Sequence, residues 1–565
     1  MKKLEGTNEE LEEKPKDHLL EALQKLGKGS GFLYMIFFFT VTPLLLNGMT
    51  TMSQIFIAAV PGHWCSVPEL RKANWTDEQI RNISSVGSCS KYNYDYEYLA
   101  RIGFEAAVEF KRTHELPATS NCPVRDFAND IDGTSYVKEW DLVCDKIAYR
   151  SNVQMALSLG KLIGSFFGAF GDKYGRKIMY RIGLVLLLVS GPTSSIVPWY
   201  WGFMLLRLIA GISYMVVGYS AFTILTEVAE ERYRQWLGIA FNAGYALGIA
   251  ILGGVAYALR DWRYIVASTT VPAVFLILNV WLMPESPRWL ISQNRRKEAR
   301  KIIEQFYGPI TEDEVGKQPI STNGESNAEG QYDLSKNKEI DPIKNRFREN
   351  WKNFKSLYTH SELFKRILIV YFLWMTTSFS YYALALNVQN FSTNRYYYVV
   401  IMGLTEIPAY LLATPLLMVM GRRQATTMLY SIGALCLLGI LALPSTKTLA
   451  IVSICLIGRF ALSIVFGIII LYTSELFPTV ARSSAIGTSS SIAHTGSILA
   501  PYVADLLGAI AWYSTTTVCG IMAFLAGILC LLLPETRGRA LADSIEEAVT
   551  KKRGRVSLRN CYSCN

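Results

Sequence analysis

The sequence predicts an all-α membrane protein with twelve transmembrane helices in two six-helix pseudo-repeats and an outer disulfide-linked loop domain. Hydrophobic residues make up 51% of the 565 residues, charged residues make up 18%, and the mean hydropathy is +0.22. A membrane-spanning helix needs about 20 mostly apolar residues, and about twelve such stretches occur along the chain. This composition excludes a disordered chain, a small disulfide scaffold and an ordinary soluble enzyme.

The apolar stretches define the predicted spans in order. They are residues 32–60, 149–170, 178–199, 202–224, 236–259, 264–283, 365–388, 396–420, 425–444, 449–473, 484–508 and 509–533. Two long polar segments, 61–148 and 284–364, follow the first and the sixth span. Because the number of spans is even, both termini are expected on the same side of the membrane.

Basic residues predict which side that is. Arg288 and Lys301 follow the sixth span closely, and Lys and Arg near span ends favour the cytoplasm. The 61–148 segment is then extracellular. Three segments are expected in the cytoplasm: 1–31, 284–364 and 534–565. The same asymmetry accounts for the net charge of +10, so no nucleic-acid partner is predicted.

The first thirty residues contain no apolar core of a signal peptide, so we expect the first span to direct targeting.

The 61–148 segment has the composition of an exposed, oxidised domain. Four of the ten cysteines lie in it: Cys65, Cys89, Cys122 and Cys144. Four cysteines in an oxidising compartment predict two disulfides, but three pairings exist and the sequence does not choose among them. The acceptor sequences at Asn74 and Asn82 predict N-glycosylation. We therefore predict a disulfide-linked, glycosylated domain between the first and second spans.

An internal repeat divides the spans into two halves. Three landmarks return in order, at offsets of 246, 248 and 250 residues: GRK at 175–177 as GRR at 421–423, Glu227 with Arg234 as Glu475 with Arg482, and PES at 284–286 as PET at 534–536. Three ordered matches at nearly constant spacing predict homologous halves. The first half comprises the 32–60 span and residues 149–283, and the second comprises residues 365–533.

These motifs carry a family resemblance. The segment GSFFGAFGDKYGRK at 164–177 resembles the loop 2–3 signature of the major facilitator superfamily. Further segments resemble the organic ion transporters of solute carrier family 22: EWDLVC, TEVAEERYR, PESPRWL, YYALALN, EIPAY, YTSELFPTVAR and PETRG. The resemblance covers about residues 30–540. It departs in the outer domain, which has four cysteines where family members usually carry six. The glutamine-rich seventh helix of sugar porters is absent, so sugar is not the favoured substrate.

The resemblance implies a substrate site between the halves and a cytoplasmic clamp that holds the outward-facing state. Gly160, Gly164 and Gly168 leave one face of the second span bare for close helix packing. The residues expected to gate transport are Gly164, Gly168, Asp172, Arg176, Glu227, Arg234, Glu475 and Arg482. The alternative is plain interface packing with charges that reach the membrane surface.

Ionisable residues inside the spans are the first candidates for substrate binding, because burying them in a bilayer costs about 2.5–3.5 kcal/mol on insertion scales. These candidates are Lys161, Glu406, Arg459 and His494. For Glu406 and Arg459 the alternative is an internal ion pair, for Lys161 a structural role, and for His494 a hydrogen-bonded core histidine. In the family, cation-selective members resemble one another in carrying an acid at the His494 position, and anion-selective and carnitine-type members carry Arg. Aromatic rings bind organic cations, which adds Tyr381, Tyr382 and Phe222, and Asn387 is a candidate for orienting a polar group.

The predicted function is polyspecific transport of small organic ions across the plasma membrane by alternating access. Cations or zwitterions are favoured over anions because Glu406 is the clearest buried acid. The alternatives are an organic anion exchanger that uses Lys161, Arg459 and His494, and a non-transporting receptor on the same fold. No phosphate-binding loop or catalytic constellation occurs, so we predict no enzyme activity, no cofactor and no metal. The coupling ion and the oligomeric state stay open.

Overall fold

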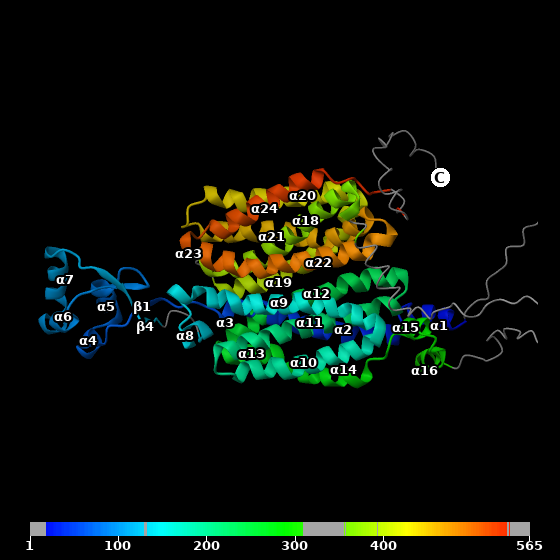
Figure 1. The fold of residues 1–565 in the computed structure, drawn as a ribbon, viewed down its shortest axis with the longest axis horizontal. Helices are drawn as coiled ribbons and strands as arrows, with labels where there is room; N and C mark the ends of the chain where they lie inside the picture. Colours follow the sequence, from blue (N-terminus) through cyan, green and yellow to red (C-terminus); the bar gives the residue numbers. More distant parts are fainter. Residues whose placement is uncertain are drawn as a thin grey trace, which may run out of the picture.

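The computed structural model describes residues 18–128, 133–308, 358–391 and 394–538, with the single residues 355 and 542. Most of the predicted 1–31 segment and 534–565 tail lies outside the described residues, as does the connection expected at 311–345. Within the described part, long helices form a bundle in two layers, one from each predicted half (Figure 1). The predicted division into two helical halves is therefore confirmed.

The first half contains the following helices: α2 (Gly31–Met52), α3 (Gln54–Ile57), α9 (Ile147–Tyr174), α10 (Arg176–Ile196), α11 (Tyr200–Val228), α12 (Glu231–Leu259), α13 (Trp262–Thr270), η2 (Val271–Leu276) and α14 (Ile277–Leu282). The second half contains α18 (Ser361–Leu386), η4 (Asn387–Asn390), α19 (Arg395–Val419), α20 (Arg422–Gly439), η5 (Ile440–Ala442), α21 (Thr448–Leu476), α22 (Thr479–Tyr502), η6 (Val503–Leu507), α23 (Gly508–Ile510) and α24 (Ser514–Leu531).

Ten helical segments in the described residues are long and apolar enough to cross a membrane. The other two predicted spans correspond to α9 and α22, which have 28 and 24 residues but carry many Gly and Ser residues and the charged or titratable Lys161 and His494. These two helices pack against each other between the halves. Their polar side chains therefore face protein instead of lipid, which accounts for their lower apolarity.

Several predicted boundaries move because helices break inside the apolar stretches. The first span divides at Ser53 into α2 and α3. The sixth becomes three pieces, because Pro272 lies in a 3-10 segment and cannot continue the helical hydrogen bonds. The eleventh ends in the π-helical turn Val503–Leu507. Such π turns are rare and are frequently found at functional sites.

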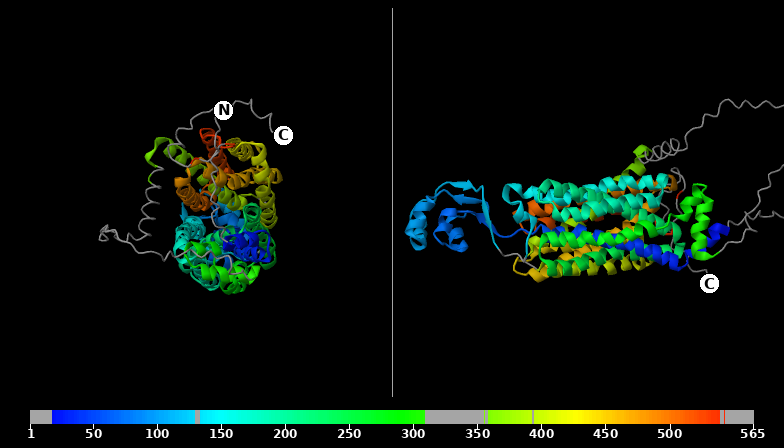
Figure 2. Two further views of the ribbon diagram at one scale, coloured as in Figure 1. Left: turned by 90° about the vertical axis from the view of Figure 1, so that its right-hand side faces the viewer. Right: turned by 90° about the horizontal axis from the view of Figure 1, so that it is seen from below.

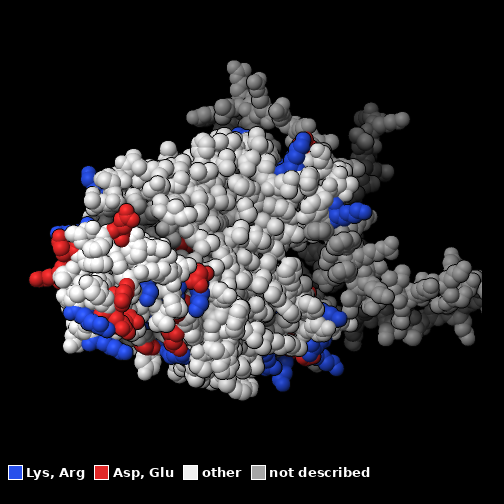
Figure 3. Space-filling view, turned by 60° about the vertical axis from the view of Figure 1, so that its left-hand side comes forward, with Lys and Arg blue, Asp and Glu red and all other residues white. Residues whose placement is uncertain are grey.

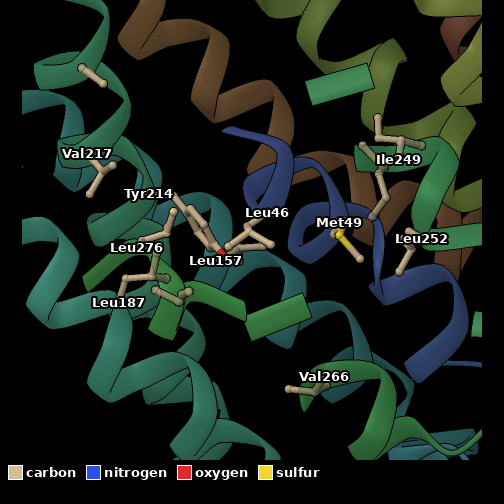
Figure 4. Packing of buried hydrophobic residues seen from close by; sticks show 14 of the residues in the cluster. Leu46, Met49, Leu157, Leu187, Tyr214, Val217, Ile249, Leu252, Val266 and Leu276 are labelled. Carbon is tan, nitrogen blue, oxygen red and sulfur yellow. The ribbon is translucent and has the colours of Figure 1, made fainter. Parts of the chain in front are cut away.

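The bundle contains two apolar cores: one lies within the second half, and the other fills the first half and extends to α18 and α19 where the halves meet. Figure 4 shows the first half, where Leu46 and Met49 of α2 lie near Leu157 of α9, Tyr214 of α11 and Ile249 of α12. In lipid, helix association depends on van der Waals packing and small residues, because the tails are as apolar as the side chains. The glycine face of α9 supplies such packing: a Cβ on Gly160 would overlap the Leu208 carbonyl, and one on Gly211 would overlap the Leu157 carbonyl.

The segment between α3 and α9 is called the disulfide domain; most of it surrounds a small core of its own, whereas its last α-helix packs on the bundle through Tyr136 and Val137. Its elements are β1 (His63–Cys65), α4 (Pro68–Lys72), α5 (Asp77–Ser84), β2 (Ser90–Tyr92), α6 (Tyr96–Ile102), α7 (Phe104–Thr113), β3 (Thr119–Asn121), β4 (Arg125–Phe127), α8 (Tyr136–Glu139) and η1 (Cys144–Lys146). Antiparallel pairs β1–β4 and β2–β3 form its two sheets, with His63 opposite Phe127 and Ser90 opposite Asn121.

The four cysteines of this domain form the two predicted disulfides. The pairs are Cys65–Cys122 and Cys89–Cys144, a choice that the sequence left open. Around them lies a small core that includes Trp64, Leu70 and Ile80. The ring of Trp64 is covered by the Arg81 guanidinium at 4.7 Å from its centroid.

The disulfide domain projects from one end of the bundle, and three short helices lie at the opposite end (Figures 1 and 2). We call these the disulfide end and the loop end. The three helices are α1 (His18–Leu26), α15 (Pro287–Ser292) and α16 (Arg296–Tyr307). Figure 3 shows charged side chains gathered over the disulfide domain, while the visible bundle surface beside it is mainly uncharged. This distribution suits a bundle embedded in lipid with both ends in water.

Candidate functional site

A buried ion pair marks the second half near its contact with the first. Glu406 of α19 and Arg459 of α21 form a salt bridge, with 1% and 2% of their side chains exposed. Tyr381 of α18 joins the pair: its hydroxyl donates to Glu406 Oε1 at 2.7 Å, and its ring lies 4.3 Å from the guanidinium carbon of Arg459. Three predicted site residues from three helices thus form one cluster. Both the hydroxyl and the ring face of Tyr381 are engaged within it.

A tyrosine cluster surrounds this pair and reaches into the first half. Tyr382 packs against Tyr381 with ring centroids 5.2 Å apart. Tyr410 of α19 lies near Glu406, Arg459 and Tyr382. Tyr245 of α12, which the sequence analysis did not identify, lies within electrostatic range of Tyr382 and Glu406. In the described part of the chain, Glu406 Oε2 is buried without a hydrogen-bond partner, and the Tyr245 hydroxyl lies close to the Tyr382 and Thr51 side chains without a well-aligned hydrogen bond to either.

Lys161 lies on the other side of this cluster, in the first half. Its side chain is 5% exposed, and its ammonium donates to Thr51 Oγ1 at 2.6 Å. Thr51 in turn donates to Asn47 Oδ1 at 3.0 Å. His494 of α22 lies within electrostatic range of Lys161, so these two predicted residues approach each other from opposite halves. Thr51 also interacts with Tyr245, which connects the two groups of residues.

Two predicted binding residues lie away from these groups. Asn387 is buried at the disulfide end, where its Oδ1 accepts a hydrogen bond from Asn390 at 2.7 Å. Phe222 is 37% exposed on α11 and packs on Phe241 with centroids 5.1 Å apart. In the described contacts, neither side chain touches the Glu406 pair.

The predicted gating charges form a matching network in each half at the loop end. Arg176 pairs with Asp172 at 2.9 Å and with Glu227 at 2.8 Å. In the second half, Arg422 pairs with Glu475 at 3.0 Å. Among the described contacts, none of these ion pairs joins the two halves. In the described residues, the charges that the resemblance assigns to a clamp between halves therefore pair within each half.

The repeated acid of the PES and PET motifs caps a helix in each half. Glu285 accepts hydrogen bonds from the backbone amides of Arg176 and Lys177 at 3.1 Å. Glu535 accepts equivalent bonds from Arg422 and Arg423 at 2.8 and 3.1 Å. A carboxylate at a helix N-terminus satisfies free amides and the positive end of the helix dipole. Burial raises the pKa of Glu285, and these amide donors partly oppose that rise.

The two arginines at equivalent positions of the repeat, Arg234 and Arg482, have nitrogen atoms without a described hydrogen-bond partner. Arg234 donates to the Ala229 carbonyl at 3.2 Å, and its Nε is buried without a partner. Arg482 has two such buried atoms, Nε and Nη2, and Glu227 has one, Oε2. In the described part of the chain, these gating residues thus keep donors and an acceptor free at the loop end.

At the disulfide end, polar side chains do connect the halves. Arg150 of α9 pairs with Asp505 of η6 at 3.1 Å, with 8% and 6% of their side chains exposed. Ser151 donates to Asp505 Oδ2, and Tyr502 donates to Asn152 Oδ1, both at 2.6 Å. We call these residues the disulfide-end latch. These residues were not among the predicted site residues, although Asp505 lies within the predicted 484–508 span and, like Glu406, is an ionisable residue inside a span.

The two asparagines of the predicted glycosylation sites are exposed on the disulfide domain. Asn74 follows α4, and Asn82 lies in α5. Their position is compatible with modification, which stays a prediction.

A duplicated helical bundle with charged and tyrosine side chains where its halves meet defines a membrane transporter of the major facilitator fold. A family model described as "Sugar (and other) transporter" matches residues 84–547. The chain belongs to this family, which is a family of transporters and not of enzymes.

Individual proteins agree with this assignment. The organic cation transporter protein of Drosophila melanogaster is 29% identical over 540 residues, covering 93% of this chain and 94% of its own. Organic cation/carnitine transporter 2 of Homo sapiens is 29% identical over 541 residues, covering 93% of each chain. Members of solute carrier family 22 are also similar, which confirms the predicted resemblance. The inward-open xylose transporter of E. coli shares the fold, with a TM-score of 0.58, 16% identity, and coverage of 92% of this chain and 99% of its own.

Proposed function

We propose that the protein transports small organic ions across the plasma membrane by alternating access. The carrying observation is that buried charged and tyrosine side chains of both halves meet around Glu406, whose Oε2 has no hydrogen-bond partner among the described residues. Buried polar groups are normally hydrogen-bonded, so open ones at a contact between moving halves support a substrate site. Similarity to organic cation transporters supports the same substrate class.

In this proposal, cations and zwitterions bind through Glu406 Oε2 and the neighbouring tyrosine rings. Arg459 balances the charge of Glu406, so the site attracts a cation through one open carboxylate oxygen and ring faces instead of a net negative charge. Cation–ring attraction adds about 0.5–2 kcal/mol, the larger value applying when water is excluded. Such a site tolerates different cations, which suits polyspecific transport.

In the proposed cycle, the disulfide end and the loop end of the bundle close in turn. The disulfide-end latch is formed, whereas the loop-end charges pair within each half. We infer that this arrangement faces the cytoplasm, with the disulfide end outside the cell and both termini inside. The free atoms of Arg482, Arg234 and Glu227 then become partners of the opposite half when the loop end closes.

Uptake into proteoliposomes tests this function. Labelled tetraethylammonium should accumulate with saturation in liposomes that contain the protein, and not in matched protein-free liposomes. Unlabelled organic cations should compete for this uptake. Binding without accumulation would instead favour the receptor, and accumulation restricted to organic anions would favour the exchanger.

A further inference from the structure

Lys161 is a buried ammonium with spare hydrogen-bonding capacity. It is 5% exposed and donates one described hydrogen bond, to the neutral hydroxyl of Thr51. An ammonium has three donors. Among the described residues, no carboxylate lies within ion-pair distance of it. A buried charge without a counter-ion is costly, and inside a membrane such a group usually faces a pathway or a partner.

Residues of the first half hold the Lys161 amine in place, and a residue of the second half lies near it. Thr51, which accepts from the amine, is itself bonded to Asn47 at 3.0 Å on α2. The group that approaches from α22 is His494, which offers no negative charge. The amine is therefore held at the contact between halves with nothing described there to neutralise it.

An open acceptor lies on the opposite side of the same group. Tyr245 interacts with Thr51 on one side and with Tyr382 and Glu406 on the other. Glu406 Oε2 has no hydrogen-bond partner among the described residues. The Lys161 amine, which has spare donors, and Glu406 Oε2, which has no described donor, thus belong to one group of neighbouring residues from both halves.

We propose that Lys161 binds the carboxylate of the transported substrate and selects ions that carry a carboxylate together with a cationic group. The carboxylate accepts the spare Lys161 donors, while the cationic group lies against Glu406 Oε2 and the tyrosine rings. Charge-assisted hydrogen bonds are strong in a low-dielectric interior. This inference rests on the proposed transport function and names its substrate class.

A matched pair of probes separates carboxylate recognition from general damage. Glycine betaine and choline share a trimethylammonium group, but only betaine carries a carboxylate. In proteoliposomes, Lys161→Met should lower betaine uptake by about tenfold or more, the loss expected for one charge-assisted hydrogen bond, and change choline uptake by less than about twofold. Lys161→Arg, which keeps the charge, should retain part of the betaine uptake. Lys365→Met, which removes an exposed lysine of α18, should leave both rates unchanged.

Three outcomes overturn the inference. Equal loss of betaine and choline uptake in Lys161→Met, with unchanged protein amount, would assign Lys161 a structural role. Transport of choline without betaine by the unmodified protein would exclude carboxylate selection but leave the proposed function intact. Accumulation of neither these probes nor tetraethylammonium would contradict the proposed function itself. If Lys161→Met fails to fold, Thr51→Val provides the second variant, and an equal effect on both probes would again count against the proposal.

Discussion

The buried pair of Glu406 and Arg459 combines a structural role with the proposed binding role, and one substitution does not separate them. Replacing Glu406 alone leaves the Arg459 guanidinium buried without its counter-ion. Breaking such a pair costs about 3–5 kcal/mol, whereas neutralising both partners is often tolerated. A loss of transport in Glu406→Gln could therefore result from destabilisation of the fold as well as from lost substrate binding.

The double variant Glu406→Gln/Arg459→Gln resolves this. We expect it to recover the folded amount and thermal stability that Glu406→Gln loses, because no uncompensated charge remains. Tetraethylammonium uptake should stay reduced by about tenfold or more, because the open carboxylate oxygen is missing and each 1.4 kcal/mol corresponds to a factor of ten. Recovery of both stability and uptake would show that the pair is structural only. Arg459→Gln alone provides the control for loss of the guanidinium.

Sequence reasoning found the ionisable residues of the site but not their partners. Glu406, Arg459, Lys161 and His494 were identifiable because charge inside an apolar stretch is costly. Thr51 and Tyr245 were not, because a threonine or tyrosine in a span carries no comparable signal. Their importance depends on contacts with residues far away in the chain, such as that between Lys161 and Thr51, and no local pattern specifies those contacts.

At the scale of elements, α9 and α11 pack closely through glycines. A Cβ at Gly211 would overlap the Leu157 carbonyl oxygen, a backbone atom that cannot move aside alone. We expect Gly211→Ala to destabilise the protein by about 1–3 kcal/mol, the usual cost of overpacking. A lower thermal unfolding temperature in detergent would show this. Gly218→Ala on the same helix is the matched control, because nothing lies within 4 Å of the added atom there, and an equal effect of both variants would contradict the packing argument.

At the same scale, the internal repeat could be predicted from the sequence, whereas the breaks within the helices could not. Motifs at offsets of 246–250 residues predicted equivalent loop ends, and Glu285 and Glu535 indeed cap α10 and α20 in the same way. Hydropathy does not distinguish a continuous helix from one broken at Ser53 or at Pro272, because the residues on both sides are equally apolar. It also ranks α9 and α22 low, since helices that face another protein surface need not be apolar.

For the whole molecule, the disulfide-end latch determines which end of the bundle is closed. The pair of Arg150 and Asp505 is almost completely buried between the halves. Nearby, Phe56 of α3 stacks on Tyr396 of α19, with ring centroids 5.2 Å apart and 4% of Phe56 exposed. Separation of the halves at this end would expose both contacts. The balance between the two ends therefore depends on interactions that exist in one arrangement only.

Asp505→Asn should shift this balance toward opening of the disulfide end. The substitution leaves Arg150 buried beside a neutral amide, which weakens the closed arrangement by up to about 3–5 kcal/mol. In a Phe56→Cys background, an impermeant maleimide applied to intact cells should label the new cysteine slowly, and at least about tenfold faster once Asp505→Asn is added, since 1.4 kcal/mol changes a population tenfold. Asp505→Glu, which keeps the charge, should change the rate less.

The four free cysteines of the described residues lie in the bundle, three of them buried, so labelling of the parent protein gives the background. Equal labelling rates with and without Asp505→Asn would show that the latch does not hold this end closed, and the proposed orientation of the cycle would have to be reversed or abandoned.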